Sequence, residues 1–159
     1  MGLDMYLFAN KYVRGTDYDW KTDVPLPTPE FDAILSATGM ERSDFQNDYP
    51  SVQLSFKVGY WRKQNAIHNW FVNAVGKGED NCQPYYVSRS DLDELVSLCQ
   101  SALADKNPDI LPPISGFFFG STDIDDTYWW SIQYTLDMVS AILDNPKFAD
   151  CDFEYVASW

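Results

Sequence analysis

The chain has 159 residues, of which 45% are hydrophobic and 16% are aromatic, and it carries a formal net charge of -13. This length and composition are typical of one globular domain with a single core, spanning residues 1–159, and they exclude a disordered chain. The acidity argues against general nucleic-acid binding, because a phosphate backbone needs a basic surface.

The spacing of the cysteines and the hydropathy of the chain indicate the cellular compartment in which the protein is found. Cys82, Cys99 and Cys151 are an odd, widely spaced set without a CxxC motif, which favours reduced thiols over a disulfide framework. No apolar run reaches the length of a membrane span, and the N-terminus lacks the basic region and apolar core of a signal peptide. We therefore expect a cytoplasmic protein that does not engage a membrane.

Sequence patterns predict three elements in the first third of the chain. Residues 1–13 alternate loosely and are rich in aromatic and aliphatic side chains, which predicts a strand. Residues 14–27 contain glycine and proline and are typical of a loop, which we expect Tyr18 and Trp20 to pin to the domain surface. Residues 28–30, TPE, give an N-cap, a proline and an early acid, and they predict a short helix through residue 37.

The central stretch from Tyr60 to Phe71, YWRKQNAIHNWF, holds the only histidine and two adjacent cations. It follows residues 52–58, whose period-two alternation predicts a strand with one buried face. A helical period then starts at Arg62 and ends at Gly76, and its apolar stripe comprises Ile67, Trp70, Phe71, Ala74 and Val75. We expect the opposite side to carry Arg62, Asn65, Asn69 and Asn73, with His68 at its margin.

The second half contains two longer helical patterns. Residues 85–87 read as a short strand, and Ser88 caps a helix in which Cys99 is a small core residue. Residues 111–122, LPPISGFFFGST, place three rings on an extended segment, which favours burial in the core. Ser121 or Thr122 is the expected cap of a last helix running to about residue 143, and residues 153–159 alternate as a final strand.

Along the chain, the predicted strands and helices roughly alternate. Because the strands are short and mixed in pattern, they favour an α+β fold over a doubly wound parallel sheet. We expect a mixed or mainly antiparallel sheet with about four helices packed on it.

Two junctions place aromatic rings beside polar groups at the starts of helices, where free backbone N–H groups bind anions. If the junctions meet, they form one pocket. We therefore predict a ligand-binding site made of Tyr60, Trp61, Arg62, Asn65, His68, Asn69, Ser121 and Thr122. The alternatives are a solvated helix face for the asparagines and a structural role for the lone histidine.

Acidic residues gather toward the C-terminus, where residues 105–159 carry ten acidic and two basic side chains, a net of -8. The cluster Asp123, Asp125 and Asp126 is a candidate contact for a basic protein, with ordinary solubility as the alternative. We predict no metal there, because the glycine and distal glutamate of a calcium loop are absent. We also predict no cofactor.

Four blocks, MGLDMYL, YWRKQNAIHNWF, YYVSRSDLDEL and GFFFGSTDIDDTYWW, resemble an uncharacterised family of small proteins found in bacteriophages and prophage-bearing bacteria. The likeness covers the chain from Met1 to about Trp130 and assigns no functional residue. It implies an accessory protein made in the cytoplasm of a bacterial host. The small size and the acidity of the chain favour a host-directed role over virion structure.

Two functions follow as hypotheses. The first is a binding protein that contacts a host protein through its acidic surface, in host takeover or anti-defence. The second is a pocket that binds, or cleaves, a small phosphorylated ligand such as a nucleotide signal. For cleavage, His68 would be the general acid or base, paired with Asp4 or with an acid among residues 123–126. A single histidine without a recognisable nucleophile favours binding over catalysis.

Overall fold

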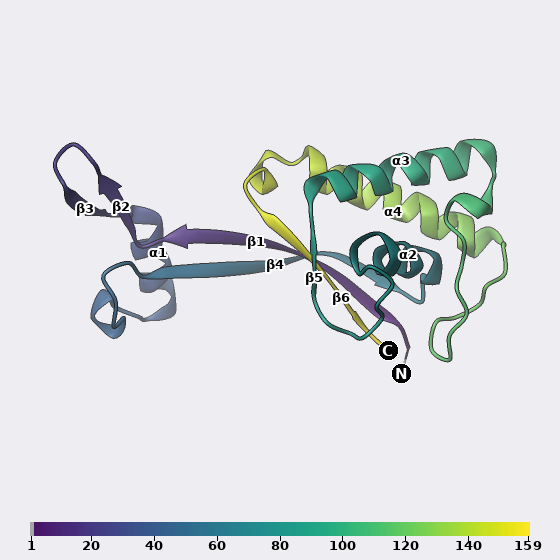
Figure 1. The fold of residues 1–159 in the computed structure, drawn as a ribbon, viewed down its shortest axis with the longest axis horizontal. Helices are drawn as coiled ribbons and strands as arrows, with labels where there is room; N and C mark the ends of the chain where they lie inside the picture. The colour runs from purple at the N-terminus through teal and green to yellow at the C-terminus, as the bar shows by residue number, and fades with distance from the viewer. Residues whose placement is uncertain (1) are drawn as a thin grey trace. The chain divides into compact units, whose positions relative to one another are not determined.

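The computed structural model describes residues 2–159, which form two compact units. The first unit comprises residues 2–9 and 56–159, and the second comprises residues 10–55. Figure 1 shows the strands and the four α-helices of the chain. The predicted α+β class with a mainly antiparallel sheet is confirmed, whereas the assignment of the chain to one domain stays a prediction. Met1, where the first predicted strand starts, lies outside the described residues.

A four-stranded sheet in the order β4-β1-β6-β5 is the framework of the first unit. Its strands are β1 (Asp4–Arg14), β4 (Ser51–Arg62), β5 (Tyr85–Val87) and β6 (Asp152–Ser158). Alternate residues of β1 and β6 are buried, namely Met5, Leu7 and Ala9 in β1 and Phe153, Tyr155 and Ala157 in β6. Burial with a period of two places one face of the sheet against the core.

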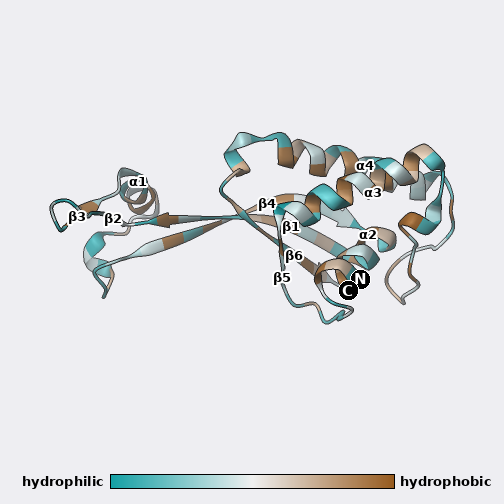
Figure 2. Cartoon of the chain, turned by 45° about the horizontal axis from the view of Figure 1, so that its top comes forward, coloured by the Kyte–Doolittle hydropathy of each residue, from teal (hydrophilic) through white to brown (hydrophobic). Residues whose placement is uncertain are grey.

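Helices α3 (Arg89–Asp105) and α4 (Asp126–Asp144) pack against each other over this core. Figure 2 shows hydrophobic and hydrophilic segments alternating along both helices, as amphipathic helices require. The cap predicted for α4 is wrong: the Asp125 carboxylate accepts a bond from the Tyr128 backbone N at 3.0 Å. Ser121 instead donates its hydroxyl hydrogen to Asp123. No helix within residues 2–159 has the length and apolar character needed to cross a membrane.

Helix α2 (Asn65–Trp70) continues as a π-helical turn over Phe71–Val75. The predicted start at Arg62 is wrong, because β4 extends to that residue and Lys63 then turns the chain with a φ of 55°. The prediction of a single apolar face is also wrong, since His68 is only 1% exposed. Ala74, placed in the apolar stripe, is exposed because the wider π turn shifts the helical register.

The phenylalanine-rich segment 111–122 forms a loop in which the three rings have different environments. Phe119 is buried, Phe118 is half-buried and Phe117 is 95% exposed. A turn closed by the bond from the Phe119 backbone N to the Gly116 carbonyl, at 3.1 Å, changes the direction of the chain here. The expectation of core packing is therefore wrong for Phe117.

The second unit contains the hairpin of β2 (Thr16–Asp19) and β3 (Val24–Pro27), followed by α1 (Pro29–Thr38). Helix α1 starts at its predicted proline and ends at Gly39, whose φ of 71° suits glycine. The loop predicted for residues 14–27 is a hairpin instead. Tyr18 and Trp20 do not pin it, because both side chains are exposed.

The N-terminus of α3 provides a test of local stabilisation. Ser88 and Asp91 form a capping box, with the Asp91 backbone N 3.1 Å from the Ser88 hydroxyl and the Ser88 backbone N 2.7 Å from the Asp91 carboxylate. We expect Ser88→Ala to lower the free energy of unfolding by about 1 kcal/mol. Urea denaturation followed by circular dichroism measures it. Ser101→Ala is the matched control on the same helix, because Ser101 is exposed and bonds only the Ser97 carbonyl; an equal loss in both variants would contradict the capping role.

The buried thiol of Cys99 makes stability depend on alkaline pH. Burial raises the pKa of Cys99 from 9.0 to about 12. Between these values the unfolded chain releases a proton that the folded chain retains, so the free energy of unfolding falls as pH rises. One such group contributes at most about 1.4 kcal/mol per pH unit.

We therefore expect Cys99→Ala to lose stability less steeply than the wild type as pH rises above 9. Urea denaturation at several pH values measures the two slopes. Ser101→Ala, on the same helix, removes no ionisable group and should keep the wild-type slope. Identical slopes for the wild type and Cys99→Ala would show that the Cys99 thiol is not the group responsible.

Candidate functional site

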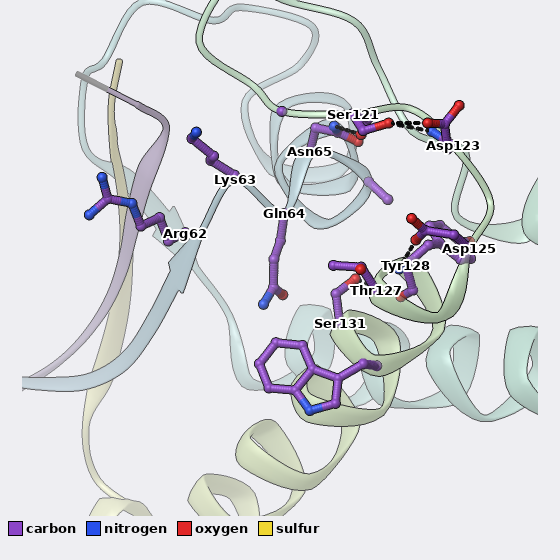
Figure 3. A pocket seen from close by; sticks show the side chains of 13 residues that line it. Arg62, Lys63, Gln64, Asn65, Ser121, Asp123, Asp125, Thr127, Tyr128 and Ser131 are labelled. Atoms are coloured by element: carbon purple, nitrogen blue, oxygen red, sulfur yellow. Dashed lines mark hydrogen bonds between the residues drawn. The ribbon is translucent and has the colours of Figure 1, made fainter.

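A pocket of about 320 Å³ lies where the end of β4 and the start of α2 face the segment leading into α4. Figure 3 shows its side chains from close by. It belongs entirely to the first unit. Its lining comprises Arg62, Lys63, Gln64, Asn65, Ala66, Gly120, Ser121, Asp123, Asp125, Thr127, Tyr128, Trp130 and Ser131.

The buried amide of Asn65 holds the two sides of the pocket together. Its Nδ2 donates to the backbone carbonyls of Phe119 and Ser121, at 3.2 and 2.8 Å. Between these two residues, Gly120 adopts a φ of 92°, and an added Cβ would lie 3.2 Å from the Lys63 Cβ. The close approach of the two chain segments therefore needs both the asparagine and the glycine.

Gln64 occupies the floor between these segments and is only 9% exposed. Its Oε1 lies 3.5 Å from the Thr135 hydroxyl, which also lies 2.8 Å from the Ser131 carbonyl. One hydroxyl hydrogen favours the shorter bond, so Oε1 is weakly engaged. Its Nε2 has no hydrogen-bond partner among residues 2–159. Figure 3 shows this amide directed toward Ser131 and Thr127.

Two carboxylates line the side of the pocket that precedes α4. Asp123 accepts a bond from the Ser121 hydroxyl at 2.7 Å, and Asp125 caps α4. Asp126, the third member of the predicted acidic contact, does not line the pocket. Within residues 2–159, no three His, Cys, Asp or Glu side chains gather in a way that could hold a metal ion.

The two cations, Arg62 and Lys63, lie at the opposite rim. Figure 3 shows both side chains directed away from the Gln64 amide. The Arg62 guanidinium lies 3.9 Å from the Asp4 carboxylate. Asp4 also accepts a 2.5 Å bond from the Tyr60 hydroxyl, and this bond raises the pKa of Tyr60.

An exposed ring completes the lining. Trp130 is 60% exposed, although it is one of the bulkiest apolar side chains of the unit. It stacks on Tyr134 with centroids 5.2 Å apart and planes at 15°, and the Tyr134 hydroxyl donates to the Tyr60 carbonyl at 3.1 Å. These contacts fix the orientation of the indole plane.

The structure brings together only part of the predicted site. Arg62, Asn65 and Ser121 line the pocket, whereas the other predicted ligand residues do not; these are Tyr60, Trp61, His68, Asn69 and Thr122. Trp61 is buried and donates its indole N–H to Thr135 at 3.0 Å. Asn69 donates to the Pro112 carbonyl at 2.9 Å. Both therefore support the fold around the pocket.

His68 belongs to a buried polar cluster behind the pocket. Its Nδ1 lies 2.7 Å from the Tyr155 hydroxyl, and its Nε2 lies 3.1 Å from the Asp80 carboxylate. A hydrogen on Nε2 satisfies all three groups, because Nδ1 then accepts from the tyrosine. Burial raises the pKa of Tyr155 well above its ordinary value, so it remains a neutral donor. Neither Asp4 nor the acids at 123–126 serve as partners of His68 among these bonds.

Sequence reasoning missed several lining residues, namely Lys63, Gln64, Thr127, Trp130 and Ser131. Among these residues, the sequence pattern could have pointed only to Trp130. It falls beside the predicted buried stripe of α4 and is therefore expected at the surface. Gln64 gave no signal, because nothing in a sequence distinguishes a glutamine that lines a pocket from one on a solvated surface.

The buried cluster predicts a structural role for Tyr155. We expect Tyr155→Phe to lower the free energy of unfolding by about 1–3 kcal/mol, because it leaves the buried Nδ1 of His68 without a donor. Urea denaturation measures the loss. Tyr86→Phe is the matched control on the neighbouring strand, where the side chain is exposed and should lose little. A loss of the same size in Tyr86→Phe would contradict the role of the cluster.

Comparisons of the chain with protein-family models, with curated proteins and with solved structures found no match. The chemistry of the site is therefore inferred from its own side chains, which are a buried amide, an exposed indole, two cations and two carboxylates.

Proposed function

We propose that the pocket binds a small phosphorylated ligand such as a nucleotide and does not turn it over. The observation that carries this proposal is Gln64, which is nine-tenths buried, lines the pocket and leaves its Nε2 without a partner among the described residues. This Nε2 is not among the fully enclosed side-chain atoms that lack a partner, so it reaches the open pocket and can donate to a ligand there. A ligand that carries an acceptor can take the place of solvent on this donor.

The Gln64 amide selects for a planar polar edge. It offers a donor and a weakly engaged acceptor side by side, and a glutamine amide pairs with an adenine edge through these two groups. The neighbouring Asn65 uses Nδ2 for the loop carbonyls, so its Oδ1 remains as an acceptor. A nucleobase presents donors and acceptors that fit such a pair of amides.

Trp130 supports the same ligand class. A base stacked on an aromatic side chain gains about 1–3 kcal/mol. The indole is exposed and held in place by Tyr134, so stacking needs no rearrangement of the ring.

The charges of the lining residues restrict the class of ligand further. Two cations and two carboxylates give a net of zero. The cations at the rim, Arg62 and Lys63, suit phosphate oxygens, whereas Asp123 and Asp125 accept hydrogen bonds from sugar hydroxyls. A free phosphate ion has no hydroxyl-rich part for the carboxylates. We therefore expect a nucleotide to bind more tightly than inorganic phosphate.

Binding is proposed without catalysis because the pocket lining contains neither histidine nor cysteine. His68 is buried between Tyr155 and Asp80 and does not line the pocket. The two carboxylates of the lining already accept bonds from Ser121 and from the backbone of Tyr128. The lining thus lacks the histidine or cysteine that most often serves as general base or nucleophile.

The host-protein contact through Asp123, Asp125 and Asp126 stays a prediction, as does the phage accessory role. It has less support than the pocket, because Asp123 and Asp125 line the pocket and hold its local backbone.

Calorimetric titration with AMP, GMP, CMP, UMP and inorganic phosphate tests the proposal. We expect at least one nucleotide to bind, and Gln64→Leu to weaken that binding by about tenfold or more. The same substitution should change the free energy of unfolding little, because it gives up only the weak 3.5 Å contact with Thr135 and introduces an apolar side chain of similar size. Loss of binding without loss of stability is the expected signature.

Two exposed lysines with nearly the same φ angle provide the control for the effect of a positive charge on nucleotide binding. Lys63 and Lys77 have φ values of 55° and 54°, but only Lys63 lines the pocket. Lys63→Ala should weaken nucleotide binding, whereas Lys77→Ala should not. If no nucleotide binds, or if Gln64→Leu binds as the wild type does, the proposal is wrong.

A further inference from the structure

The second unit exposes more large apolar side chains than it buries. Within residues 10–55, the buried ones are Phe31 and Leu35. The exposed ones are Tyr12, Tyr18, Trp20, Val24, Leu26, Met40 and Tyr49. Soluble proteins scatter single apolar residues on their surfaces, but a concentration of aromatic residues and methionine is typical of protein interfaces.

The β2-β3 hairpin carries the densest part of this surface. Tyr18 pairs with Pro25, while Asp17 and Asp19 pair with Leu26 and Val24. Paired residues lie on the same side of a hairpin, so one side carries Tyr18 with proline and the other carries aliphatic side chains beside carboxylates. We call Asp17, Asp19, Val24 and Leu26, which share one side, together with Trp20 in the turn, the hairpin surface.

The turn of the hairpin is ordered by Asp19. Its carboxylate accepts bonds from the Lys21 backbone N at 2.9 Å and from the Thr22 hydroxyl at 2.8 Å. Its carbonyl accepts from the Asp23 backbone N at 2.9 Å. These bonds present Trp20, which is 78% exposed, on a preorganised turn. An ordered backbone at Trp20 lowers the entropic cost of binding, and tryptophan is enriched among interface hot spots.

We propose that the hairpin surface binds a basic surface of another protein. Residues 10–55 contain four basic and eight acidic side chains, a net of -4, and the whole chain has a charge of -13. Of the basic ones, Arg42 is paired with Asp32, and Lys21 lies over the Trp20 ring. This negative charge repels nucleic acid, anionic lipid and a second copy of the chain, whereas it attracts lysine- and arginine-rich surfaces.

Strand addition is disfavoured at the β3 edge of the hairpin. Strand addition needs a row of N–H donors along a free edge. Pro25 and Pro27 occupy alternate positions of β3 and have no N–H. Aromatic and aliphatic contacts flanked by charge pairs are therefore the expected mode of binding. This proposal is independent of the ligand pocket, which lies in the first unit.

A displayed library of random peptides, selected on the immobilised full-length chain, tests this proposal. Peptides that bind the Trp20→Ala variant are removed before each round. We expect the retained peptides to combine lysine or arginine with apolar residues and to bind more weakly at high salt. Fluorescence polarisation should show that Trp20→Ala weakens the best peptide about tenfold or more, and that Asp17→Asn reduces its salt dependence.

Trp130→Ala is the matched control, since it removes another exposed tryptophan outside the second unit. It should leave peptide binding unchanged while weakening nucleotide binding, and Trp20→Ala should do the reverse. Failure of one proposal is thus distinguishable from failure of the other. The hairpin proposal is overturned if no peptide survives the depletion, if the survivors are acidic or neutral, or if sedimentation shows a dimer that Trp20→Ala dissociates.

Discussion

The Asn65 amide is the constraint on which the first unit's pocket depends. It joins two segments that are more than fifty residues apart in the chain, because its Nδ2 bonds the carbonyls of both Phe119 and Ser121. Those carbonyls lie in a loop, where they have no ladder or helix partner. A buried asparagine therefore satisfies backbone groups that would otherwise be unpaired, and in doing so it fixes the distance between the end of β4 and the start of α4.

The same region shows two opposite uses of buried polar groups. His68, Tyr155 and Asp80 satisfy one another, so their cluster contributes to a unique packing of α2 against β6. Gln64 directly precedes α2 and is 9% exposed, and its amide reaches the pocket with only a weak bond to the protein. A polar group that reaches a pocket without a protein partner is available to a ligand, whereas the satisfied cluster indicates stability.

The two units differ in how they use aromatic side chains. In the first, rings such as Trp61, Phe71 and Tyr155 are buried and pack on one another, with Phe71 and Tyr155 stacked at 3.9 Å. In the second, Tyr18 and Trp20 are exposed on a hairpin ordered by Asp19. Buried rings that contact other rings stabilise the fold, whereas rings exposed on an ordered turn, or at a pocket as Trp130 is, are available for recognition.

Local rules in the sequence determined the α+β class, the bounds of α1 to within one residue, the start of α3 and the position of β5, because caps, prolines and short-range alternation act within a few residues. They also drew attention to Arg62, Asn65 and Ser121. Only the tertiary structure decided that α2 is enclosed on several sides, which reversed the prediction for His68. It also decided which residues line the pocket. Gln64, Lys63 and Trp130 acquire their roles from neighbours distant in the chain, and no local pattern encodes those neighbours.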